Sequence, residues 1–179
     1  MSTTNTNTNS PLGIIAAVWG VGGVILILGS AIVRLTPIAW TTIIGPLEWW
    51  HIVFGVVWTI FMAYSEGYRG FQRAFSPRVV ARAQWLSRNP SLLHVLLAPL
   101  FCMAFFHATR KRLIVSWAIT MMVIFFIIGA KLLPDPWRGL VDIGVVVGLT
   151  WGLAAILGWC IAGLRGVPLP CPPDVPLES

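Results

Sequence analysis

Long apolar runs separated by short polar segments dominate this sequence and limit what it can fold into. They cover residues 12–33, 48–66, 92–108, 113–133 and 139–164, and the first contains no charged side chain. A run of about 20 apolar residues matches a helix that crosses the hydrocarbon core of a bilayer. Hydrocarbon offers the backbone no hydrogen-bond partner, so a helix must satisfy it internally. The sequence therefore predicts an all-α polytopic membrane protein with five transmembrane helices.

The composition supports the same class. Hydrophobic residues make up 57% of the chain, charged residues only 10%, and the mean hydropathy is +0.83. A soluble domain carries about a quarter charged residues, and a disordered chain needs low hydrophobicity, so both classes are excluded. The net charge of +6 comes from basic residues placed between the apolar runs. We expect these residues to meet anionic lipid headgroups rather than nucleic acid.

The third run is the shortest, and two topologies compete for it. Residues 92–108 span only about 25 Å as a helix, near the lower limit for a crossing, and Pro99 lies in the middle. With five crossings, seven basic residues lie on one side and five on the other; if the third run re-enters instead, the division is nine against three. The second division obeys the positive-inside rule better. Because the run carries no charge, we nevertheless predict five crossings.

The two ends of the chain differ from its centre. Residues 1–11 are polar and are expected to form a disordered tail, whereas residues 12–165 form a single transmembrane domain. Residues 166–179 are rich in proline and are expected to be extended and exposed. The connections are short and no large soluble domain is present, which leads us to expect a bacterial cytoplasmic membrane.

The loop between the second and third runs concentrates charge and aromatic rings. Ser76 and Pro77 have the residue types of a helix N-cap and first helical position, and apolar residues recur on one face after them. We predict a short basic amphipathic helix at 76–88 that lies on the membrane surface. The residues expected to contact lipid or a partner are Arg69, Arg73, Arg78, Arg82, Trp85 and Arg88.

Two histidines could serve as haem ligands. Antiparallel neighbouring helices would place His51 and His107 at similar depth, where two imidazoles can ligate a b-type haem from both faces. The pattern of His51, Gly55 and Trp58 resembles the haem-ligand helices of several membrane cytochromes over about two helical turns. That resemblance implies haem b as a cofactor. The competing interpretation is that both are ordinary interfacial histidines.

Two groups of ionisable residues are candidates for a proton or ion path. Glu48 and His51 share one helical face, and Asp142 lies one turn after Arg138. An intramembrane carboxylate often marks such a path. For the first pair, a carboxylate in the first turn of a helix is the simpler interpretation, because the helix dipole favours it. For Asp142 and Arg138, a structural ion pair is the simpler interpretation.

Gly144, Gly148 and Gly152 repeat at a spacing of four residues in the last run. A stripe without side chains lets two helices approach closely, and such packing drives helix association in lipid. We therefore predict a helix-packing face here, rather than space for a flat cofactor.

Three functions are compatible with these features. A structural or accessory membrane component, part of a homo-oligomer or a larger complex, ranks first. A small b-type cytochrome with His51 and His107 ranks second, and a transporter or channel that uses Asp142, Glu48 and His51 ranks third. The sequence contains no catalytic motif and no metal-ligand spacing, so it gives no support for an enzyme and predicts no metal site.

Overall fold

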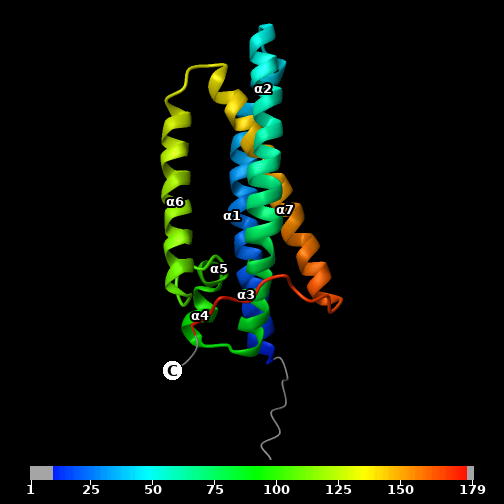
Figure 1. The fold of residues 1–179 in the computed structure, drawn as a ribbon, viewed down its shortest axis with the longest axis vertical. Helices are drawn as coiled ribbons and strands as arrows, with labels where there is room; N and C mark the ends of the chain where they lie inside the picture. The colour runs from blue at the N-terminus through cyan, green and yellow to red at the C-terminus, as the bar shows by residue number, and fades with distance from the viewer. Residues whose placement is uncertain (1–9, 177–179) are drawn as a thin grey trace, which may run out of the picture.

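A computed structural model describes residues 10–176 and contains no strand within them. Its helices are α1 (Pro11–Ile44), α2 (Trp49–Met62), the π-helix η1 (Ala63–Phe75), α3 (Ser76–Arg88), α4 (Leu92–Leu96), α5 (Ala98–Cys102), α6 (Arg110–Lys131) and α7 (Trp137–Leu164). The predicted all-α class is therefore confirmed (Figure 1). Three of the helices, α1, α6 and α7, are long and apolar enough to cross a membrane. Of the tail predicted to be disordered, residues 1–11, the first nine lie outside the described residues, whereas Ser10 and Pro11 are the N-cap and the first residue of α1.

Helix α1 is longer than the apolar run that predicted it. Ser10 caps its start, because the side-chain oxygen accepts a hydrogen bond from the N–H of Gly13 at 3.0 Å. The helix continues past Arg34 and past Pro37 and ends at Ile44, directly before Gly45 and Pro46. A proline inside a helix removes only one donor, and a helix within an apolar environment tolerates that loss when neighbouring groups compensate.

The second apolar run and the predicted surface helix form one rod. Helices α2, η1 and α3 follow one another without a break, and Phe75 has right-handed helical backbone angles rather than those of an N-cap. The prediction of a helix at 76–88 is correct in its bounds, but the prediction that it lies separately on the surface is wrong. Val79, Ala83 and Leu86 belong to the hydrophobic core. Ser76 caps nothing, and its hydroxyl oxygen is buried without a hydrogen-bond partner.

The third apolar run does not form a single helix. Residues 92–108 contain the two short helices α4 and α5, followed by a turn in which Ala104 and His107 have positive φ angles of 61° and 48°. A continuous crossing helix at this position is therefore wrong. Pro99 lacks the N–H that a helix needs, and carbonyl groups of the turn accept hydrogen bonds from Arg82 of α3 instead.

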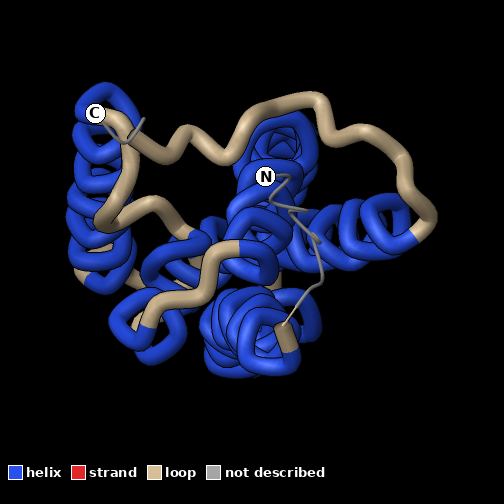
Figure 2. The backbone as a smooth tube through the Cα atoms, turned by 90° about the horizontal axis from the view of Figure 1, so that it is seen from below, coloured by secondary structure: helices blue, strands red, loops and turns tan. Residues whose placement is uncertain are grey.

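Helix α7 is the centre of the packing. It contacts α1, the α2–η1 part of the rod and α3, while α5 packs against α1 (Figure 1). Helix α6 stands at the edge of the bundle, and Ala130 is the one buried residue along its length. The segment after α7 crosses the end of the bundle and returns towards the start of α6 (Figure 2). This return brings the C-terminal tail onto the same end as α3, α4 and α5.

Candidate functional site at the basic end of the bundle

Arg82 is the most buried charged residue that the structure describes. Only 1% of its surface is exposed, although it lies in the segment predicted to contact lipid or a partner. Its Nε donates to the carbonyl oxygen of Phe101 at 2.6 Å, and its Nη2 donates to the carbonyl oxygens of Phe106 at 3.2 Å and His107 at 3.0 Å. Its Nη1 donates to the carbonyl oxygen of Pro173 at 2.8 Å. The prediction of an exposed Arg82 is therefore wrong.

These contacts explain how the broken segment after α5 is held. A backbone that leaves the helix exposes carbonyl groups that need donors, and one guanidinium supplies several in a fixed planar fork. The cation also lies over the Phe101 ring, 4.1 Å from its centroid. Burial lowers the pKa of Arg82 to about 10, so the side chain stays charged at neutral pH.

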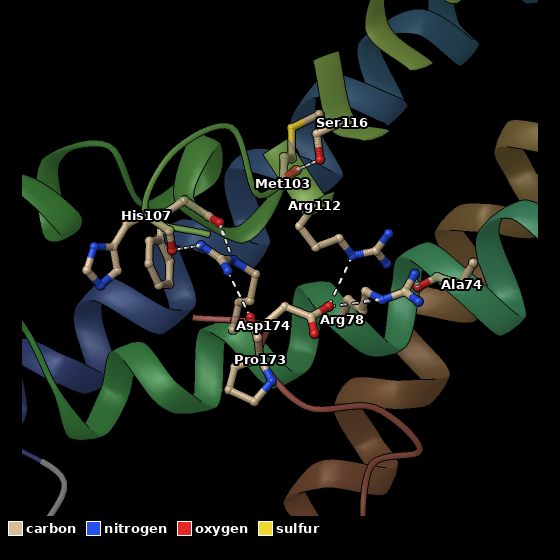
Figure 3. Close-up of polar contacts among 10 residues, drawn as sticks. Ala74, Arg78, Met103, His107, Arg112, Ser116, Pro173 and Asp174 are labelled. Carbon is tan, nitrogen blue, oxygen red and sulfur yellow. Dashed lines mark hydrogen bonds and ion pairs between the residues drawn. The ribbon is translucent and has the colours of Figure 1, made fainter. Parts of the chain in front are cut away.

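The C-terminal tail is bound to the same place. The Asp174 carboxylate lies 3.0 Å from Nε of Arg112 and 3.6 Å from Nε of Arg78, and the backbone N–H of Thr109 donates to the Asp174 carbonyl oxygen at 3.0 Å (Figure 3). Val175 packs against the hydrophobic core. The sequence predicts an extended, exposed tail, so this docking corrects that prediction for residues 173–175.

The other predicted contact residues are divided between two environments. Arg69, Arg73 and Arg88 are exposed, and the guanidinium of Arg73 lies 5.7 Å from the ring centroid of Tyr68. Trp85, expected as a membrane anchor, instead stacks on Phe101 with a centroid distance of 5.5 Å. Arg69 and Arg73 belong to the helix η1 rather than to a surface loop, and η1 contacts α7 through other residues, among them Phe71.

The two candidate haem ligands are not brought together. The ring of His51 lies 5.0 Å from that of Trp137, where α7 begins. The ring of His107 lies 4.6 Å from that of His94, at the end of the bundle where α4 and α5 lie (Figure 1). His51 and His107 therefore lie at opposite ends, because the third run does not return across the bundle. His94, to which the sequence assigns no partner, is the neighbour of His107.

The candidates for a proton or ion path have local partners. The N–H of Glu48 donates to Nδ1 of His51 at 3.2 Å, so this pair caps the start of α2. Arg138 lies 4.0 Å from Asp142, whose side chain is 7% exposed. One carboxylate oxygen of Asp142 is buried without a hydrogen-bond partner. Both arrangements have the geometry of the simpler structural interpretations.

The three glycines of α7 lie where the α2–η1 part of the rod contacts this helix. Gly144 faces Trp58 and Met62, Gly148 faces Glu66, and Gly152 faces Phe71. A Cβ built on Gly152 would lie 2.5 Å from Cγ of Phe71, which is closer than real Cβ atoms approach other atoms. The stripe thus allows α7 to contact the rod along α2 and η1.

A second face of α7 remains uncovered. An open, mainly apolar groove of about 780 Å³ runs along α7 beside η1. Its residues include Ala154, Gly158 and Ala162, which repeat at a spacing of four, and two tryptophans. Trp151 and Trp159 donate their indole N–H groups to the side-chain and backbone oxygens of Gln72, at 2.7 Å and 3.1 Å.

Sequence reasoning missed Asp174 and the uncovered face of α7. The only signal for Asp174 was its acidic side chain in the proline-rich tail. If the third run does not cross, this tail lies on the same side of the membrane as the basic loop between the second and third runs. The signal for the groove was a second small-residue repeat in the last run. Within residues 10–176, no three His, Cys, Asp or Glu side chains are grouped so that they could hold a metal ion.

Comparison with known proteins adds no family to this description. Family models, curated proteins and solved structures were searched, and none of the three searches found a match to this chain.

Proposed function

We propose that this chain is an accessory component of a membrane complex and that its uncovered α7 face packs against a transmembrane helix of a partner. The observation that carries the proposal is the groove along α7 and η1, with Ala154, Gly158 and Ala162 as its small residues. In lipid, no hydrophobic force drives helices together, and close packing at small residues takes its place.

Exposed charges on η1, the helix that contributes Gln72 to the groove, indicate the chemistry of that partner. Arg69 and Arg73 are exposed on η1, in the same helical segment as Gln72, which contacts Trp151 halfway along α7. A charged side chain at membrane depth is costly, and such residues usually face another protein segment and pair there. We therefore propose a partner helix, from a second copy or another subunit, that carries a carboxylate opposite these arginines.

The proposal includes a topology of four crossings, by α1, the α2–η1 rod, α6 and α7. Helices α4 and α5 are too short to cross and lie at the α3 end (Figure 1). That end holds seven basic residues in α3, the first turn of α6 and the residue after α7, whereas Lys131 and Arg138 lie at the other end and Arg34 lies in the part of α1 nearer to that end. The positive-inside rule then places the α3 end in the cytoplasm, in our proposal that of a bacterium.

The partner interface is tested by adding bulk to the groove. Gly158 and Gly129 both lie in apolar helices, and a Cβ built on either would have no neighbour within 4 Å. Gly158→Leu should convert the native complex, extracted in mild detergent and sized by light scattering, into a smaller particle, and Gly129→Leu should not. Arg69→Gln with Arg73→Gln should weaken the same complex. A wild-type chain that elutes alone as a monomer would refute the proposed function.

The topology is tested independently by labelling. In a Cys171→Ser background, Asn89→Cys and Asp135→Cys place thiols at the two ends of the bundle. A membrane-impermeant maleimide added to intact cells should react with the thiol at position 135 and leave that at position 89 unlabelled. Reaction at both positions, or the reverse pattern, would contradict four crossings with the α3 end inside.

A further inference from the structure

We propose that Arg78 and Arg112 form a binding site for the phosphate group of an anionic phospholipid, and that the Asp174 carboxylate occupies this site when no lipid is bound. The inference rests on the proposed function, because it requires the α3 end of the bundle to lie at a membrane surface. It adds a specific ligand and a competing segment of the chain itself.

The first observation is that the carboxylate satisfies the two arginines unequally. Oδ2 of Asp174 forms a hydrogen bond with Nε of Arg112 at 3.0 Å, but it lies 3.6 Å from Nε of Arg78, beyond hydrogen-bonding distance. Nε of Arg78 is buried and has no hydrogen-bond partner. A phosphate is larger and offers several acceptor oxygens, which guanidinium groups bind in a bidentate manner.

The second observation is the charge that these groups would carry without the tail. Arg78 comes from α3 and Arg112 from α6, and Asp174 is the acidic partner that both share (Figure 3). Both side chains remain partly exposed, Arg78 at 33% and Arg112 at 18%, although Nε of Arg78 is itself buried. Arg82 does not compete for the ligand, because one of its hydrogen bonds holds α5 and two hold the loop after it. Release of the tail would thus leave two accessible cations close together.

The third observation is that the tail can leave without unfolding a helix. Residues 167–176 contain no helix or strand, and Asp174 has a φ angle of 52°, in the left-handed region that Asp adopts more readily than most residues with a side chain. The segment is held by the hydrogen bonds from Arg82 to Pro173 and from Thr109 to Asp174, by the packing of Val175 on the hydrophobic core, and by the Asp174 carboxylate. A competing anion has to replace only this small set of contacts.

The position of Arg112 favours a lipid as the source of the phosphate. Helix α6 has 22 residues, so it is roughly 33 Å long, which is close to the thickness of the hydrocarbon core. Arg112 lies in its first turn and therefore at the level where lipid phosphates lie in a bilayer that α6 crosses. Arg110 and Lys111, which are exposed beside it, add to the local positive charge.

The test titrates the detergent-purified full chain with phosphatidylglycerol and counts bound lipids by native mass spectrometry. Phosphatidylcholine serves as the net-neutral lipid and inorganic phosphate as the free anion. Asp174→Asn should bind phosphatidylglycerol about tenfold more tightly than the wild type, because the competing charge is removed. Arg78→Gln with Arg112→Gln, in the Asp174→Asn background, should abolish that gain. The matched control, Arg110→Gln with Lys111→Gln in the same background, removes the same amount of charge and should keep most of the gain in affinity.

A second measurement follows the tail in the unmodified sequence. Cys171 lies in the docked segment and is partly buried. Phosphatidylglycerol should increase the rate at which a water-soluble maleimide labels this thiol, relative to phosphatidylcholine, with Cys171→Ser as the blank. The inference is overturned if Asp174→Asn binds phosphatidylglycerol no more tightly than the wild type. It is also overturned if the control pair of substitutions removes the gain as fully as the Arg78 and Arg112 pair, or if free phosphate binds the site as well as the lipid does.

Failure of this inference and failure of the proposed function give different results. If only the lipid site is wrong, Gly158→Leu still reduces the size of the complex and position 89 stays protected from the external maleimide. If the proposed function is wrong, one of those two results fails whatever the lipid titration gives.

Discussion

The guanidinium of Arg82 donates to the carbonyl oxygen of Phe101 at 2.6 Å and lies 4.1 Å from the centroid of the Phe101 ring. The same two residues are therefore joined through both backbone and side chain. This contact fixes α3 against α5 and holds in place the segment that the sequence predicted to cross the membrane.

Arg82→Lys should destabilise this end of the protein although it keeps the positive charge. An ammonium group cannot reproduce the planar fork, so carbonyl groups of Phe101, Phe106 and His107 would lose their donor. We expect the free energy of unfolding to fall by about 3 kcal/mol, measured by denaturant titration in detergent micelles. Arg88→Ala removes an exposed arginine from the same helix and should change the free energy of unfolding by less than about 0.5 kcal/mol.

Substitution of two glycines by alanine should have opposite effects on stability. Gly152→Ala places a methyl group against the ring of Phe71, and the resulting overpacking should cost about 1–3 kcal/mol. Gly129→Ala adds the same methyl group where no atom lies within 4 Å, and should be neutral or stabilising by up to about 1 kcal/mol. Thermal unfolding of both variants measures the difference, and equal effects would contradict the packing of α7 on η1.

The stability of the α4–α5 region should fall in mild acid. Burial, together with the nearby His107 and Arg82, holds the pKa of His94 below its ordinary value of 6.5. The unfolded chain therefore binds a proton at higher pH than the folded chain, so stability is lost as the pH falls below about 6.5. His94→Gln should reduce this pH dependence, as measured by thermal unfolding between about pH 5 and pH 8. If the pH dependence of stability is unchanged in this variant, groups other than His94 cause it.

The separation of His51 from His107 predicts the outcome of a haem test. Because the two imidazoles lie at opposite ends of the bundle, no haem can be held between them within one chain. We expect protein purified from haem-supplied cells to lack a haem band that depends on both histidines. The dithionite-reduced minus oxidised absorption spectrum should contain no band that disappears both in His51→Ala and in His107→Ala. A band with that behaviour would require a different fold for residues 92–108.

Helices α6 and α7 could be predicted because their apolar runs are long and are bounded by charged residues or prolines. The bounds of α3 were predictable for a different reason, because Pro77 suits the first turn of a helix and apolar residues recur on one face after it. The environment of α3 was not predictable, because an arginine beside an apolar face is compatible with a membrane surface and also with a buried position where it binds several carbonyl groups. Helix α1 passed through Arg34 and Pro37, two residues that usually mark an end, because its neighbours continue to pack beyond them.

The sequence by itself determined the class of this protein, since runs of apolar residues this long can satisfy their backbone only as helices. It also determined where α7 is packed closely, because glycine at every fourth position leaves room for a neighbouring helix. Only the tertiary structure decided that residues 92–108 form two short helices and a turn instead of one long helix. That choice depends on donors from Arg82, on a different helix, to carbonyls that no local pattern could satisfy. The position of Asp174 was decided in the same way, because its partners Arg78 and Arg112 lie far from it in the chain and meet it only in the folded protein.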